Sequence, residues 1–282
     1  METEVDIVEF KVPVENDKTL FIWNILPTFS EAYIYDRIFK HFSVFGALFS
    51  LRVRANASVA EPGFYAIVKF FSAAQACWAQ EATDGRGLFQ DKPLKVRLCT
   101  RQNPAFCQTV RCLSSAKCQE LANYYLGFNG WSSRVVTLHD ISITDNAGLL
   151  PLGTETQAVS LKYGCIVELM FTKHGVSCRG VGVAEELLEN NPDPVERLLK
   201  RGKVQKYAKE RAFCNAFQKV LLVVLGDGKV AVECRLDPDE IVPDEDLEGL
   251  IQVNDISWSE FAGVEEDEDL LYDLSLNMTD VP

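Results

Sequence analysis

The six residues LFIWNI, numbers 20–25, alternate aliphatic and aromatic side chains in the pattern of a β-strand. Successive side chains of a strand point to opposite faces, so Leu20 and Ile22 share one face while Phe21 and Trp23 share the other. The aliphatic face suits a buried core. The opposite face carries two large flat rings, which raises the question of what those rings contact.

Three further strand patterns follow in the first hundred residues, at 47–54, 63–70 and 94–99. Between the first two strands, Ser30 has the chemistry of a helix N-cap, and apolar residues then recur at helical spacing up to Phe42. A second helical segment begins after Ser72. The predicted order of elements is therefore βαββαβ.

Dividing each of these strands by parity gives the same result four times. One set is apolar and could be covered by two helices: Leu20, Ile22, Phe49, Leu51, Val53, Ala66, Val68, Phe70, Leu94, Val96 and Leu98. The opposite set holds Ser50 and Ile67, three rings and five cations, with no acid; its rings and cations are Phe21, Trp23, Tyr65, Arg52, Arg54, Arg97, Lys69 and Lys95. Bases of single-stranded nucleic acid stack on such rings, at about 1–3 kcal/mol each, while cations meet phosphates. The alternative is that a helix or a protein partner covers this face.

Residues 18–100 resemble the RNA-recognition motif. LFIWNI fits the six-residue signature strand of that family, and GFYAIVKF at 63–70 fits its eight-residue signature less closely. The resemblance places Phe21 and Tyr65 at two base-stacking positions. Ile67 stands where an aromatic residue is usual, and Gly63 replaces the usual leading basic residue.

A second region begins near residue 115, where a short helical segment, Leu121 through Tyr125, is broken by glycines. Three strand-like runs follow, at 134–143, 158–172 and 175–184, and form a predicted antiparallel meander. A long helical pattern then runs from Lys203 to a C-cap at Gly226. We expect this helix to pack on the meander.

This region resembles the Rad fifty-two family of recombination mediators, which anneal complementary single strands. The resemblance is most specific at Leu-Ala-Asn followed by Gly-Phe-Asn-Gly-Trp, and it implies a structural motif of Asn123, Gly127, Asn129, Gly130 and Trp131. We expect Trp131 to be packed inside this domain and Gly130 to hold a backbone conformation that a Cβ would strain.

Most of the family's DNA-facing basic residues are absent from this sequence, since only Lys219 matches on the long helix. The run 197–211, with seven bases and one acid, is a substitute that includes Lys200, Arg201 and Lys203. It could contact phosphates, act as a nuclear import signal, or simply be a solvated helix face. The family's first helix, which helps subunits pack into rings, has no counterpart, so we expect any homo-oligomer to be a dimer rather than a large ring.

Charge is distributed unevenly along the 282 residues. Of 41 acidic residues, 16 lie in residues 237–282, which hold no Lys or Arg. The remaining 25 acidic residues face 28 basic ones, so the body carries about three net positive charges. Dense acid, the two prolines of LDPDEIVPDEDLEGL and interspersed apolar residues predict a disordered tail. It could dock on a protein partner, lie over the basic faces of the body as an autoinhibitor, or act only as a solubilising segment.

Several classes of function are not indicated. The nine cysteines include no CxxC pair and the three histidines are scattered, so we expect no metal site and reduced thiols. The GDG at 226–228 is not followed by the Lys-Ser or Lys-Thr of a phosphate loop. No run of about 18 apolar residues indicates a membrane helix, and the acidic start lacks a signal core. We expect neither an enzyme nor a cofactor.

The sequence thus predicts an α+β protein with a βαββαβ RNA-recognition motif and a Rad fifty-two-like antiparallel meander packed on a long helix. The expected divisions are an N-terminal arm (1–17), the first domain (18–100), a linker (101–114), the second domain (115–236) and the tail (237–282). The expected partners are single- and double-stranded DNA and RNA, in DNA repair, recombination and the DNA-damage response. An RNA-processing or adaptor role, with the second domain used for self-association, stays open. We expect a nuclear location, including the nucleolus or nuclear bodies, with a cytoplasmic pool.

Overall fold

The computed structural model describes residues 5–100, 112–142, 160–188 and 193–235. These residues form an α+β structure, as predicted, and divide into two compact units: residues 15–100, and residues 5–14 with 112–235. The predicted acidic tail and most of the predicted linker lie outside the described residues. No helix within the described ranges combines the length and the apolarity that crossing a membrane requires.

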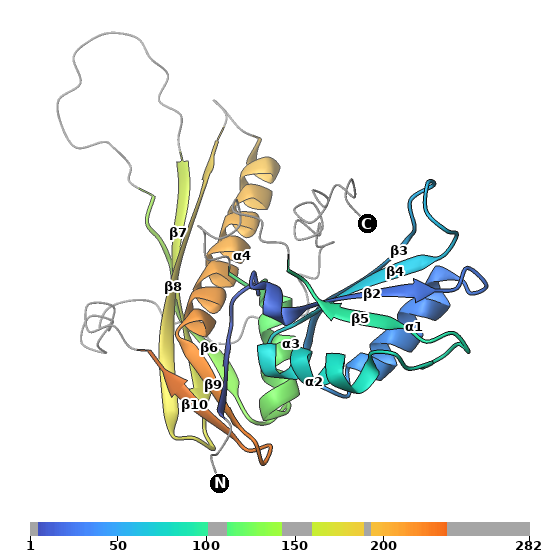
Figure 1. Ribbon diagram of the computed structural model, residues 1–282. Coiled ribbons are helices and arrows are strands. Elements are labelled where there is room, and N and C mark those ends of the chain that lie inside the picture. Colours follow the sequence, from blue (N-terminus) through green and yellow to red (C-terminus); the bar gives the residue numbers. More distant parts are fainter. Residues whose placement is uncertain (1–4, 101–111, 143–159, 189–192, 236–282) are drawn as a thin grey trace, which may run out of the picture. The chain divides into compact units, whose positions relative to one another are not determined.

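The first unit contains two helices and one four-stranded antiparallel sheet (Figure 1). After a short 3-10 turn, η1 (Asn16–Lys18), its elements in order are β2 (Thr19–Ile25), α1 (Glu31–Phe42), β3 (Leu48–Ala55), β4 (Phe64–Phe70), α2 (Ala73–Thr83) and β5 (Lys95–Leu98). The strand order across the sheet is β3-β4-β2-β5. This confirms the predicted βαββαβ RNA-recognition fold, in which β2 and β4 are central and β3 and β5 are the edges.

Local sequence explains why both helices begin where they do. The Ser30 hydroxyl accepts a hydrogen bond of 3.3 Å from the Tyr33 amide, and the Ser72 hydroxyl accepts one of 3.1 Å from the Gln75 amide. Both helices pack on one face of the sheet. The buried core between the helices and the sheet consists of Leu20, Ile22, Ile25, Ile34, Ile38, Phe42, Val53, Ala66, Val68, Phe70, Ala76, Ala79, Leu94 and Val96.

The end of β2 is shaped by an irregularity that the alternation in LFIWNI does not reveal. The register against β4 shifts between Ile22 and Ile25, and Asn24 has a φ of 68°. Asparagine tolerates this left-handed conformation better than most residues. The side-chain amide of Gln90 fixes the turn, donating to the Asn24 carbonyl at 2.8 Å and accepting from the Leu26 amide at 3.0 Å.

The second unit contains the predicted meander. Helix α3 (Ser115–Leu126) precedes strands β6 (Ser132–Asp140), β7 (Ser160–Phe171) and β8 (Val176–Leu187), which pair antiparallel in the order β6-β7-β8. Helix α4 (Pro194–Gln218) lies along β7 and β8 (Figure 1). It approaches β8 closely because Gly180 and Gly182 face it: a Cβ on either would lie 2.2 Å from a backbone nitrogen of α4.

The long helix was predicted with the wrong limits. It begins nine residues before Lys203 and ends at Gln218, so Gly226 is not its C-cap. The run of Val and Leu after it forms β9 (Val220–Leu225), and a turn at Gly228, with a φ of 82°, leads into β10 (Val230–Cys234). Tertiary pairing favours a strand here because Val and Leu in this run fit a half-buried pleated surface.

The N-terminal segment is likewise not a separate arm. Residues Val5–Glu9 form strand β1, which pairs antiparallel with β9 from Val5↔Leu225 to Glu9↔Leu221. Strand β9 is therefore the centre of a second three-stranded sheet, β1-β9-β10, that the sequence did not predict. The cause is distance along the chain, because more than 200 residues separate the two partners and no local pattern indicates the pairing.

Candidate nucleic-acid interface

The three predicted rings of the first unit form one cluster on the sheet face that the helices leave uncovered. The Phe21 ring lies between the other two, with its centroid 5.5 Å from that of Trp23 and 5.4 Å from that of Tyr65. All three side chains are half-buried, so each ring keeps an accessible surface. These distances are typical of aromatic contacts, and the contacts hold the rings in place before any ligand is present.

Cations flank the rings because of the strand order. One row across the sheet reads Arg52 on β3, Ile67 on β4, Phe21 on β2 and Arg97 on β5. In the next row Arg54 is opposite Tyr65 and Trp23 is opposite Lys95. Rings therefore occupy the central strands, and four cations occupy the two edge strands. A strand of nucleic acid that crosses this surface would meet flat rings at its centre and positive charge at both sides.

Lys69 begins a third row, opposite Ser50 on β3 and Thr19 on β2. Its ammonium group lies 6.0 Å from the centroid of the Phe49 ring. The prediction that Phe49 belongs to the core is therefore wrong. A register shift between Leu48 and Ser50 places Leu48 against the core instead, and Phe49 forms an edge contact with Phe71. A β-bulge reverses the alternation of side chains, and this one adds a fourth ring beside a predicted cation.

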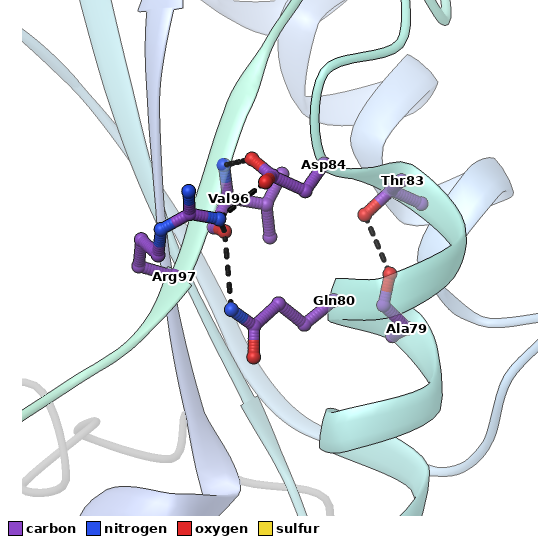
Figure 2. A network of polar contacts seen from close by, with 6 residues as sticks. All are labelled: Ala79, Gln80, Thr83, Asp84, Val96 and Arg97. Carbon is purple, nitrogen blue, oxygen red and sulfur yellow. Dashed lines mark hydrogen bonds and ion pairs between the residues drawn. The ribbon is translucent and has the colours of Figure 1, made fainter.

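Strand parity alone suggested that this face has no acid, but two acidic side chains reach its edges. Asp84, which follows helix α2, forms an ion pair with Arg97 and also accepts a hydrogen bond of 2.9 Å from the Val96 amide (Figure 2). The Val96 amide is the main cause of a lowered pKa at Asp84, and the Arg97 guanidinium adds to it. The same guanidinium donates to the Val96 carbonyl at 3.0 Å, so Arg97 is held at two points, one on its own strand and one at the end of α2.

A second acid approaches the opposite edge of the sheet. Glu31, in the first turn of α1, lies 3.8 Å from a guanidinium nitrogen of Arg54. Both side chains are about half exposed, at 58% and 52%, so this ion pair is weak and a phosphate could replace it. Lys95 is exposed, and among the described residues it forms no ion pair.

The Gly-Trp segment of the second unit is structural. Trp131 packs on two rings of α4, with centroid distances of 5.3 Å to Phe217 and 6.2 Å to Phe213, and its indole N–H donates to the Asn123 side chain at 3.0 Å. It is half-buried rather than fully enclosed. At Gly130 the constraint is steric, because a Cβ would lie 2.2 Å from the Leu126 carbonyl oxygen.

The remaining residues of that motif shape the turn. Gly127 has a φ of 76° and ends α3, since its amide donates to the Asn123 carbonyl. The left-handed conformation is therefore at Gly127, whereas Gly130 is needed for space. Asn129 is exposed in the turn between them. Asn123 is thus used twice, by its backbone at the helix end and by its side chain at Trp131.

The predicted basic residues of α4 contact groups of this unit. Lys200 pairs with Glu196 at 2.8 Å, Lys203 pairs with Glu186 at 3.2 Å, and the Arg201 guanidinium donates to the Tyr163 hydroxyl at 2.6 Å. Lys219 is the C-cap of the helix, and its carbonyl accepts from the Arg235 amide at 2.7 Å. These contacts do not favour a phosphate-binding groove, in contrast to the sheet face of the first unit.

Two further bases of the run 197–211 stabilise the fold. Lys209 is only 6% exposed, and burial lowers its pKa. Arg211 donates at 2.7 Å to the Val183 carbonyl, and Asn215 accepts at 3.0 Å from the Val181 amide. These two side chains satisfy backbone groups on the outer edge of β8, which would otherwise be open to pairing with another strand.

The sheet β6-β7-β8 carries a charged row that the sequence did not indicate. Glu168 on β7 is 7% exposed and lies directly between Arg134 on β6 and Arg179 on β8. Its two oxygens accept from the two guanidinium groups at 2.6 Å and 3.1 Å. A buried carboxylate needs such partners, so this row joins all three strands.

Comparison with known proteins identifies the family. A protein described as RAD52 motif-containing protein 1 from Danio rerio is 57% identical over 277 residues and covers 98% of each chain. The proteins of that name from Gallus gallus and Homo sapiens are 45% and 41% identical, with 96% of this chain and 95% of theirs covered. This chain belongs to the RAD52 motif-containing protein 1 family. Residues 113–221 also match a family model described as the RDM1 DSRM domain.

Two solved structures are similar to about a third of this chain. They are an Sxl-lethal protein/RNA complex, 21% identical over 29% of this chain and 48% of that one, and the Mip6 RRM3 domain, 18% identical over 31% and 98%. Both have a TM-score of 0.25. The assignment to the RAD52 motif-containing protein 1 family confirms the resemblance of the second region, and the RNA-recognition fold of the first unit agrees with nucleic-acid binding.

The sequence correctly predicted that the rings and cations of the first unit share one face of its sheet. It missed Phe49, Asp84 and Glu31. For Phe49 no sequence signal was available, because a bulge depends on the register of the neighbouring strand. Asp84 could have been noticed as one of two acids, with Asp91, in the segment between α2 and the strand that carries Arg97.

Proposed function

We propose that this protein binds single-stranded nucleic acid on the uncovered sheet face of its first unit. The observation that supports this most strongly is the arrangement of rows, with the Phe21 cluster on central strands and cations on both edge strands. Stacking is tolerant of base identity, so the same surface accommodates DNA and RNA. Double-stranded DNA is a weaker ligand for this face because its bases are stacked within the duplex.

We further propose that this binding serves DNA repair, recombination and the DNA-damage response in the nucleus, including the nucleolus or nuclear bodies, with a cytoplasmic pool. The family name, which includes the RAD52 motif, supports this role. We propose that the protein acts by binding rather than by catalysis. Its histidines, His41, His139 and His174, lie on α1, on β6 and in the turn between β7 and β8, in separate parts of the fold.

An adaptor role for the second unit is the alternative, and the contacts of α4 favour it there. Lys203 and Lys200 pair with Glu186 and Glu196, and Arg201 donates to the Tyr163 hydroxyl, so these three bases contact groups of their own unit. In that case the protein would attach a nucleic acid, bound by the first unit, to a second copy or to another protein, and an RNA-processing role would remain compatible with the same surface.

The test is a binding panel with the full chain. One sequence is presented as single-stranded DNA, single-stranded RNA, duplex DNA and duplex RNA, each at several salt concentrations. We expect both single strands to bind more tightly than the duplexes, and binding to weaken as salt rises because counterions are released. Equal affinity for all four ligands, or binding that is insensitive to changes on the sheet face, would contradict the proposed surface.

The biological role needs a separate test. Cells that lack the protein are exposed to a DNA-damaging agent and supplied with the wild-type chain or with a chain carrying Phe21→Ala and Tyr65→Ala. We expect wild type alone to restore survival. Rescue by the double variant would separate the role in repair from the sheet face, whereas normal survival without any protein would contradict the role itself.

A further inference from the structure

The first two turns of α4 carry an apolar surface that faces away from the sheet. Val195, Leu198 and Leu199 are 62%, 69% and 70% exposed. At 100° per residue they lie opposite Val204 and Ala208, which are buried against the sheet. We call these three residues the α4 apolar face. Large aliphatic residues grouped in this way on a solvated helix mark an interaction site.

Charge around this face restricts what can cover it. The α4 segment 197–211 has seven bases and one acid, and Arg197, Arg201 and Lys203 are exposed. A second copy that docked through the same face would bring two sets of these bases together, at an electrostatic cost. The favoured occupant is therefore apolar and acidic at once.

One segment of this chain has that composition. Residues 258–276, WSEFAGVEEDEDLLYDLSL, contain seven acidic residues and no basic one. They also contain Trp258, Phe261, Leu270 and Leu271 and further apolar residues. We propose that residues 258–276 dock on the α4 apolar face of the same molecule, with apolar side chains on Leu198 and Leu199 and acidic side chains near Arg197 and Lys203.

The chain length permits this contact. Strand β10, which belongs to the same unit as α4, ends at Cys234, and the 22 residues 236–257 separate that unit from the proposed docking segment. Extended, they would span up to about 70 Å, whereas the 25 residues of α4 measure about 38 Å. The linking residues are therefore long enough for the segment to reach the start of α4. This inference does not depend on nucleic-acid binding.

The test uses the full chain with a photo-activatable benzoyl-phenylalanine in place of Leu198. We expect irradiation to link this position to residues 258–276 within one molecule, as identified by mass spectrometry of the digested monomer band. The control carries the same group at Val44, which is 80% exposed in the other unit and should not link to that segment. A link between two copies, a link to other residues of the chain, or the same tail link from Val44 would overturn the proposal.

A second measurement distinguishes docking from loose attraction by charge. Amide hydrogen exchange of residues 258–276 is compared in wild type, in a chain with Leu198→Ser and Leu199→Ser, and in Val44→Ser. We expect the segment to be protected about tenfold in wild type and Val44→Ser, and to lose that protection in the double variant. Both serines replace exposed residues, so the circular dichroism spectrum should not change. Equal exchange in all three chains would overturn the proposal.

Discussion

The guanidinium of Arg97 is bound by the carboxylate of Asp84, so one cation of the sheet face is fixed before any ligand arrives (Figure 2). Arg97 lies opposite Phe21 in the sheet, beside the ring at the centre of the aromatic cluster. Its position depends on a residue that follows a helix, outside the sheet itself. Binding and stability of the first unit are therefore linked at this contact.

The first prediction concerns the ring cluster. Replacing Phe21 and Tyr65 together by Ala in the full chain should weaken single-strand binding by about 2–4 kcal/mol, because two stacking surfaces are lost. The melting temperature serves as the control for folding. Leu20→Ala, on the buried side of the same strand, should instead reduce the free energy of unfolding by about 2–5 kcal/mol. Unchanged affinity in a folded double variant would favour a face covered by protein.

The second prediction concerns the contribution of Asp84 to stability at acidic pH. The folded pKa of Asp84 is below the unfolded value of about 3.9, so the carboxylate stabilises the fold at pH values above about 4. This stabilisation is lost as the pH falls through the lowered folded pKa. Asp84→Asn should therefore reduce stability at pH 7 and flatten the dependence of stability on pH below 4. Denaturant unfolding at a series of pH values measures this, and parallel curves for the two chains would contradict it.

The third prediction compares how a cation of the sheet face and a cation of α4 contribute to the salt dependence of binding. Lys95→Ala should reduce the slope of log affinity against log salt by about 0.7, the contribution of one phosphate contact on a single strand. Lys203→Ala should change the slope less, because Lys203 pairs with Glu186 and lies near the Tyr207 ring. Titration of a fluorescent oligonucleotide at several salt concentrations gives both slopes. The reverse order would move the binding surface to α4.

The fourth prediction concerns Trp131. Trp131→Ala should lower the free energy of unfolding by about 2–4 kcal/mol, because contacts with Phe213 and Phe217 are lost at a half-buried site. Trp131→Phe keeps a ring but removes the hydrogen bond to Asn123, and should cost about 1 kcal/mol. Denaturant unfolding distinguishes the two. A Trp131→Ala chain that unfolds like wild type but binds less nucleic acid would make this residue a surface contact.

The fifth prediction uses two glycines that meet α4 differently. A Cβ at Gly182 would lie 2.2 Å from the Ala212 nitrogen and 2.3 Å from the Ala208 carbonyl oxygen, so Gly182→Ala should destabilise the unit by at least about 1–3 kcal/mol. Gly202, inside α4, has open space at its Cβ position. Gly202→Ala should therefore stabilise the chain by up to about 1 kcal/mol. Thermal unfolding of both variants checks the opposite signs.

The sequence by itself determined the elements whose pattern is local. Strict alternation from Leu20 to Trp23 assigned the faces of β2, and the hydroxyl groups of Ser30 and Ser72 marked the starts of two helices. The reason is that side-chain alternation and capping depend on residues within a few positions of one another. The ring cluster and its cations followed from these local patterns together with the predicted strand order.

Only the tertiary structure decided what depends on distant partners. The bulge that turns Phe49 toward Lys69 arises from the register between β3 and β4, and the strand after α4 forms because β1 and β10 pair with it. Asp84 reaches Arg97 because β5 lies beside the end of α2. Pairing across long loops, and the position of a side chain relative to another element, are set by packing that no local pattern records.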